Sequence, residues 1–82
     1  MEQIHKHDQA APDDRAKLRV LLSHWIEHNQ EHAASFQEWA GRARELGLEA
    51  VAKQIEVAVD RMKACSQALA VALRELGKRA PS

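Results

Sequence analysis

Apolar residues recur at helical spacing along most of this 82-residue chain. From Leu18 to Leu46, and again from Val51 to Leu76, they return every three or four residues, which is the period of one face of an α-helix. Leu46-Gly47-Leu48 separates the two segments, because glycine readily adopts the left-handed conformation that ends a helix. The pattern therefore predicts two long helices joined by a short turn.

Start and stop signals bound these two helices. Pro12 suits a first helical position, where its missing N–H would be unpaired anyway, and Asp13 and Asp14 favourably meet the positive end of the helix dipole. Gly77 is expected to cap the second helix. The expected organisation is a mobile tail over 1–11, a helical hairpin domain over 12–77 with helices at about 12–46 and 49–76, and a frayed end over 78–82.

Two long helices joined by so short a turn must lie antiparallel. A single core in 82 residues supplies only a few kcal/mol of net stability, so a further stabilising partner is expected. We expect an all-α, antiparallel two-helix hairpin that pairs into a four-helix bundle dimer, with docking on a larger protein partner as the alternative. A second apolar stripe supports this pairing: Leu22, Ile26, Ala33 and Ala40, with Ala52, Val59, Ala70 and Leu73.

Three histidines form a ladder on the first helix. His24, His28 and His32 stand at i, i+4 and i+8, so they lie along nearly one face. His32 falls near the middle of the main apolar arc, His28 towards its edge and His24 on the flank. We expect this arc to pack on the second helix, where polar groups cost stability unless each has a partner. The arc comprises Leu18, Leu21, Leu22, Trp25, Phe36, Trp39, Ala43 and Leu46.

A hairpin turning at Gly47 brings together residues whose numbers sum to about 94. His32 then lies level with Met62, and His28 lies next to Cys65. Imidazole, thiolate and thioether are ligands of soft and borderline metal ions, and a His-x3-His pair on a helix can bind one ion. We therefore expect a transition metal ion (Ni, Co, Zn or Cu) to be bound for storage, sensing or delivery. The candidate ligands are His28 and His32, with His24, Cys65 and Met62 as further ligands.

A metal-free interpretation stays open beside this one. A buried histidine often satisfies itself by hydrogen bonds to neighbouring polar side chains, and such a layer can fix the register of a hairpin or a dimer. The chain would then be a structural, protein-interaction or dimerisation module. The available partners are Asn29, Ser35, Ser66 and Gln67.

Composition excludes several other classes of function. The formal net charge is +0, which disfavours nucleic acid and anionic membranes as partners. The single cysteine, together with the absence of an apolar membrane span or signal peptide core, predicts a cytoplasmic protein. No phosphate-binding loop or His-Glu-x-x-His motif occurs, and neither predicted helix carries the Glu-x-x-His pair used by di-iron bundles, so we expect no enzyme. His5 and His7 of the tail are typical of a solvated terminus, and their part in metal binding stays open.

One stretch of the first helix also resembles a known family. The matching string is His24-Trp25-Ile26-Glu27-His28-Asn29-Gln30-Glu31-His32-Ala33, followed by Phe36, Trp39-Ala40 and Leu46-Gly47-Leu48. Over about residues 15–77 the chain resembles small prokaryotic helical domains of unknown function that carry a His-Trp-x-x-His-Asn-x-x-His helix. The resemblance implies an association with nickel or cobalt handling, and it carries over no functional residue.

Overall fold

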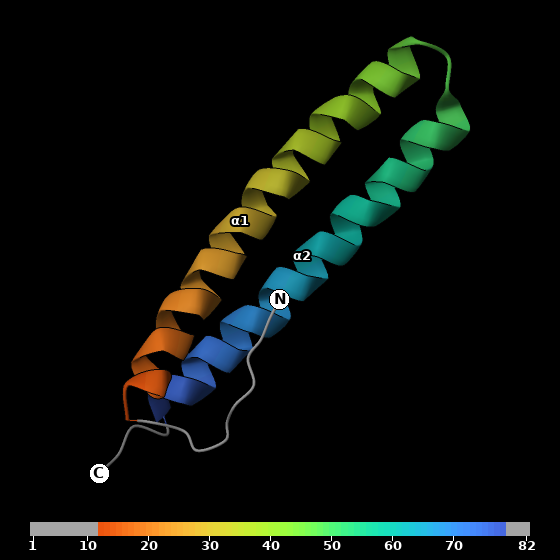
Figure 1. The fold of residues 1–82 in the computed structure, drawn as a ribbon. Coiled ribbons are helices and arrows are strands. Elements are labelled where there is room, and N and C mark those ends of the chain that lie inside the picture. Colours follow the sequence, from red (N-terminus) through yellow and green to blue (C-terminus); the bar gives the residue numbers. More distant parts are fainter. Residues whose placement is uncertain (1–11, 79–82) are drawn as a thin grey trace.

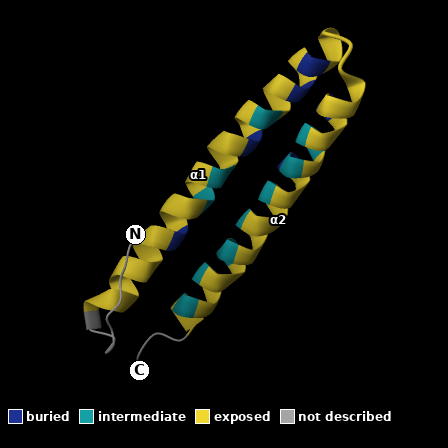
Figure 2. Ribbon diagram, turned by 45° about the vertical axis from the view of Figure 1, so that its right-hand side comes forward, coloured by how far each residue is buried: buried dark blue, intermediate teal, exposed yellow. Residues whose placement is uncertain are grey.

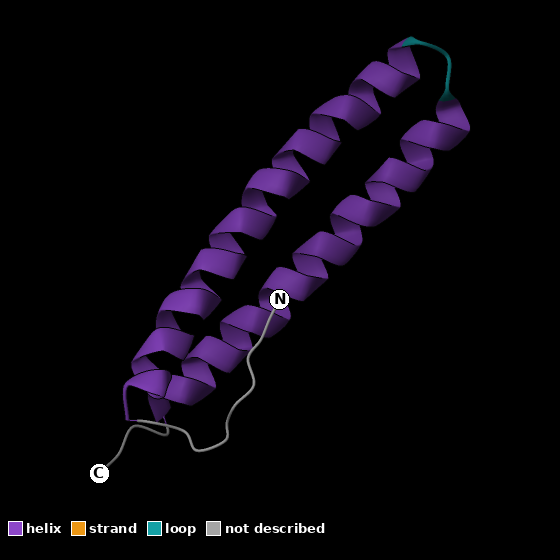
Figure 3. Cartoon of the chain, viewed as in Figure 1, coloured by secondary structure: helices purple, strands orange, loops and turns teal. Residues whose placement is uncertain are grey.

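The structure is a computed structural model that describes residues 12–78, which form two helices. Helix α1 spans Pro12–Glu45 and helix α2 spans Glu49–Lys78. They run antiparallel, side by side, as a single hairpin (Figure 1), and a short loop is the one non-helical segment between them (Figure 3). The all-α hairpin expected from the sequence is therefore confirmed. The expected mobile tail over 1–11 and residues 79–82 of the expected frayed end lie outside the described residues.

The turn between the helices is built around Gly47, as expected. Gly47 has a φ of 80°, in the left-handed region. Its N–H donates to the Arg44 carbonyl at 2.9 Å, and the Leu48 N–H reaches back to the Ala43 carbonyl at 2.9 Å. These two bonds satisfy carbonyl groups that the last turn of α1 would otherwise leave unpaired, which is the Schellman arrangement. The chain can therefore reverse within three residues.

Gly77 does not act as the expected cap of α2. Among residues 12–78, Gly47 is the one residue with positive φ, and α2 continues through Gly77 to Lys78. Glycine permits a left-handed cap but does not impose one, so its neighbours decide which conformation it takes. Helix α1 ends one residue before the expected position 46, and α2 ends two residues beyond the expected position 76.

The two helices meet along a line that is richest in small residues near the turn. The line advances by alternating steps of three and four residues on both helices, which is the heptad repeat that keeps one seam facing a partner helix. Figure 2 shows the buried and half-buried positions on the facing sides, while the outer sides are exposed. Alanine supplies four of the six buried apolar residues, so the two backbones can approach closely. The buried residues are Leu22, Ala33, Ala40, Ala43, Ala52 and Val59.

The expected arc of α1 packs on the second helix only in part: Leu22 and Ala43 are buried and Phe36 is half-buried, but the expectation was wrong for the tryptophans and Leu46. Trp25 is 41% exposed, Trp39 55% and Leu46 74%. The stripe expected to join two hairpins, including Leu22 and Ala40, forms the contact within the hairpin instead. Helix α1 is apolar on two adjacent faces, and the face of small side chains allows the closer fit against α2. The tryptophans are therefore left on the outside.

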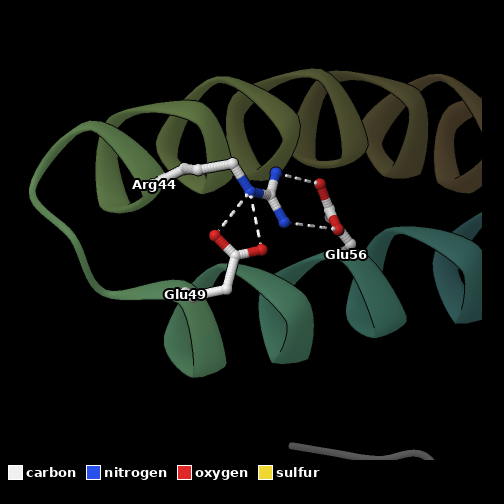
Figure 4. Close-up of polar contacts among 3 residues, drawn as sticks. All are labelled: Arg44, Glu49 and Glu56. Carbon is white, nitrogen blue, oxygen red and sulfur yellow. Dashed lines mark hydrogen bonds and ion pairs between the residues drawn. The ribbon is translucent and has the colours of Figure 1, made fainter.

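One arginine ties the end of α1 to the start of α2 (Figure 4). The Arg44 Nε donates to Glu49 Oε2 at 3.0 Å, and its Nη1 donates to Glu56 Oε2 at 2.7 Å. These hydrogen bonds raise the pKa of Arg44, and the bond from Arg44 lowers the pKa of the Glu56 carboxyl. The contacts span two turns of α2, so they fix how the helices leave the turn. Neither helix contains an apolar stretch long enough to cross a membrane.

Two glycine substitutions should change stability in opposite directions. Gly47→Ala should lower the free energy of unfolding by about 1–2 kcal/mol, because a Cβ disfavours the left-handed φ. Gly41→Ala, inside α1, should raise it by about 0.5–1 kcal/mol by restricting the unfolded chain. Neither added Cβ meets an atom within 4 Å, so crowding does not contribute. Urea denaturation followed by circular dichroism measures the free energy of unfolding of both variants. A Gly47→Ala variant more stable than the native chain would contradict the turn geometry.

The stability supplied by the Arg44–Glu56 contact should depend on pH. Because the folded protein lowers the pKa of Glu56, this contribution is fully present above the ordinary glutamate value of about 4.3 and is lost as pH falls through the lowered pKa. The difference in melting temperature between the native chain and Glu56→Gln should therefore be present at neutral pH and shrink in acid. Glu38→Gln, which removes a 3.3 Å contact to Arg42 within α1, is the control. If the difference in melting temperature between the native chain and Glu56→Gln did not change with pH, the stabilising role of the Arg44–Glu56 contact would be contradicted.

Candidate metal centre

The three histidines of the ladder lie along one side of the middle of α1. The ring centroids of His24 and His28 are 5.9 Å apart and nearly stacked, at 25°. Those of His28 and His32 are 4.4 Å apart and nearly perpendicular, at 85°. All three residues are exposed, whereas the sequence placed His32 near the middle of the face that meets the second helix. The shared side is as expected, but it lies beside the seam and not within it.

His28 and His32 point their Nε2 atoms at each other. The two atoms are 2.9 Å apart, which is a hydrogen-bond distance. A neutral imidazole has one N–H and one lone pair, so one ring donates its Nε2 proton to the other. The pair therefore shares one proton along the line between the two Nε2 atoms. Without that proton, two neighbouring Nε2 lone pairs would be available as ligands.

The separation of the two nitrogens fits a metal ion. Nitrogens that each lie about 2.0–2.1 Å from one ion are roughly 2.9 Å apart at a right angle and roughly 3.4 Å apart at a tetrahedral angle. The Nε2 atoms at 2.9 Å therefore have the separation of two ligands at a right angle, which is shorter than the separation in a tetrahedral site. Imidazole nitrogen suits zinc, copper, iron and nickel ions. The spacing of His28 and His32 is thus close to that of a bidentate pair.

The other candidate ligands are less tightly gathered. The Asn29 Nδ2 donates to Cys65 Sγ at 3.5 Å, and this contact confirms the expected register between the helices. Cys65 is exposed, and Met62 is half-buried in the seam. Within residues 12–78, no group of three or more His, Cys, Asp or Glu side chains could hold a metal ion. Only the pairing of His28 with His32 is seen, and the roles of His24, Cys65 and Met62 stay predictions.

Large apolar side chains surround the histidine pair on the same side of α1. At 100° per residue these side chains fall within an arc of about 80° together with His28 and His32. His32 also packs its ring against Phe36, with centroids 5.8 Å apart. We call these residues the exposed apolar face, and each is more than two-fifths exposed: Leu18, Leu21, Trp25, Trp39 and Leu46. The histidines therefore sit at the centre of a surface that water solvates poorly.

A hydrogen-bonded layer is not buried inside a single hairpin. Among the described residues no polar or charged residue is buried, and the two histidines are exposed. Asn29 and Ser66, two of the expected partners, are half-buried in the seam. The layer considered from the sequence would therefore form only if another molecule covered the histidines.

The opposite edge of the seam carries a shallow polar groove that sequence reasoning missed. Its polar rim includes Gln30, Gln37, Lys63 and Gln67. Gln30 and Gln37 are seven residues apart on α1, and this heptad spacing is the signal that could have revealed the groove. Its amide groups can hydrogen bond but supply no acid, base or metal ligand of the imidazole type.

Comparisons with known proteins place the chain in a family. The model of the domain of unknown function DUF8180 matches residues 18–76, and the chain belongs to this family. It is 33% identical over 61 residues to an uncharacterized protein of Archaeoglobus fulgidus, a match that covers 74% of this chain and 97% of the relative. No solved structure matches the chain. The family description names no metal, so the association with nickel or cobalt handling stays a prediction.

Proposed function

We propose that this protein binds a transition metal ion for storage, sensing or delivery and performs no chemical step of its own. His28 and His32 would be the primary ligands. The single observation that carries the proposal is the 2.9 Å separation of their Nε2 atoms on a continuous helix. Further ligands would come from His24, Cys65 or Met62, as the sequence suggests.

The position of the pair favours binding rather than a purely structural role. Both residues are exposed, so an ion can reach the ring nitrogens without unfolding the hairpin. They lie near the middle of a 34-residue helix, where backbone hydrogen bonds on both sides hold their spacing. A site whose geometry exists before binding loses less entropy when the ion arrives. The helix therefore supplies preorganisation as well as ligands.

The chemistry of the donors narrows the class of ion. Two imidazoles favour borderline ions such as Ni(II), Co(II), Zn(II) and Cu(II), while participation of Cys65 or Met62 would shift the preference towards Zn(II) or Cu(I). Hard ions such as Mg(II) and Ca(II) prefer oxygen ligands and would bind weakly. We therefore propose a nickel, cobalt, zinc or copper ion as the cargo.

The exposed apolar face favours a second candidate function. A metal-free module could use this surface to bind a second copy or a larger protein, burying the histidines with Asn29 and Ser66 in a polar layer. Trp25 and Trp39 are the kind of residue enriched at the centre of protein interfaces. This candidate would explain the exposure of the tryptophans, but it leaves the convergence of two ring nitrogens without a function.

Metal binding should raise the melting temperature of the purified, tag-free chain. We expect one ion among Zn(II), Ni(II), Co(II) and Cu(I) to shift the midpoint by about 10 °C or more at about 100 times its dissociation constant, since such binding adds about 2.7 kcal/mol. The reference sample contains chelator. The double variant His28→Ala/His32→Ala should lose the shift, because both primary ligands are gone.

A matched double variant separates this site from the tail. His5→Ala/His7→Ala removes the same number of imidazoles and should retain the full shift. Identical melting curves with every ion would contradict metal binding. A midpoint that rises with protein concentration but ignores metal would instead favour the interaction module.

A further inference from the structure

We infer that a second copy of the chain completes the metal site, so that His28 and His32 of both copies surround one ion on a two-fold axis. The inference rests on the proposed function, because it names where the remaining ligands come from. The self-association that it requires uses the exposed apolar face.

A tightly bound metal ion needs more ligands than the histidine pair of one hairpin supplies. Zinc takes four ligands in structural sites, and nickel and cobalt ions also need more than two donors for tight binding. One hairpin presents two converging nitrogens, and residues 12–78 contain no group of three or more His, Cys, Asp or Glu side chains that could hold an ion. A second copy related by two-fold symmetry supplies the same two nitrogens again. Four imidazoles then satisfy a zinc-like coordination number.

The surface around the His28–His32 pair is apolar and exposed. The described residues include no large side chain that is fully buried, and Trp39 and Leu46 are more than half exposed. The two described helices form a layer one helix thick, and the residues of α1 outside the seam are exposed (Figure 2). An apolar surface of this kind is typical of the inner face of a four-helix bundle. A second hairpin is the simplest cover, because it carries the same face.

The residues of the exposed apolar face are spaced symmetrically about the middle of α1. The middle of Pro12–Glu45 falls between His28 and Asn29. Leu18, Trp25, His32 and Trp39 follow one another at intervals of seven residues, in an arrangement centred on that point. If two α1 helices pack antiparallel across a two-fold axis there, facing residue numbers sum to about 57. Leu18 then meets Trp39 of the second copy, and Trp25 meets its His32.

The charges at the ends of α1 agree with this pairing. The first turn of α1 is acidic, with Asp13 and Asp14, and Arg42 lies in its last turn, where Arg44 is already bound to Glu49 and Glu56 of α2. An antiparallel pair brings each acidic turn near Arg42 of the other copy, and it also places opposite ends of the two helix dipoles together. A parallel pair of α1 helices would bring like charges together. The antiparallel pairing thus places both His28–His32 pairs within about one turn of the axis.

The number of ions bound per chain and the mass of the oligomer, measured on the same sample, test the inference. The full chain should be a dimer by light scattering and should bind one ion per two chains in a titration with Zn(II) or Ni(II). Trp39→Glu keeps the histidine pair but places a carboxylate in the exposed apolar face. It should give a monomer whose affinity for the ion is at least 100-fold lower. Val71→Glu is the matched control, since Val71 is exposed on α2 at 46% and points away from α1, and it should change neither quantity.

Other outcomes separate this inference from the proposed function. One ion per chain, bound by a monomer and lost in His28→Ala/His32→Ala, would overturn the inference and leave the proposed function standing. Absence of binding with any of the ions would overturn both. A dimer that binds two ions and loses more than tenfold in affinity with Cys65→Ser would also overturn it. That result would mean that each hairpin completes its own site, with Cys65, which lies beside Asn29 of the same chain, as a ligand.

Discussion

The close packing of two helices along a heptad seam, with alanines at its most buried positions, is the constraint on which the rest of the structure depends. Ala40 and Ala52 are fully buried at this seam, and no tryptophan takes part in it. Alanine brings the backbones together but buries little apolar area per residue, so the hairpin gains only modest hydrophobic stabilisation from its own interface. Both tryptophans of α1 stay outside, where another molecule can reach them.

The same packing sets the chemistry of the histidines. Because the seam uses the alanine face of α1, the neighbouring face carries His28 and His32 into solvent, where their lone pairs are accessible. Their Nε2 atoms already lie 2.9 Å apart, so the helix itself performs the ordering that a flexible site would have to complete on binding. The proposed metal binding and the proposed self-association would use one surface, and covering it would enclose the histidine pair.

The turn shows how local and non-local interactions cooperate. Gly47 reverses the chain through backbone hydrogen bonds that involve only neighbouring residues. Arg44 then holds the first two turns of α2 through paired carboxylates on the surface, where solvent screens the attraction. The cap determines that the helices are antiparallel, and the arginine helps to select how they rotate about their axes. That rotation decides which side chains of α1 remain exposed.

The sequence alone determined the two helices, the turn at Gly47 and the register, which the contact of Asn29 with Cys65 confirms. These features follow from helical period and backbone conformation, which are local. It also identified His28 and His32 as a pair, because i and i+4 residues of a helix are neighbours. Only the tertiary structure decided that Ala40 rather than Trp39 faces α2, that Gly77 stays helical and that the histidines are exposed. Two adjacent faces of α1 are apolar, and the choice between them depends on how closely each fits the surface of α2, which no periodicity within α1 records.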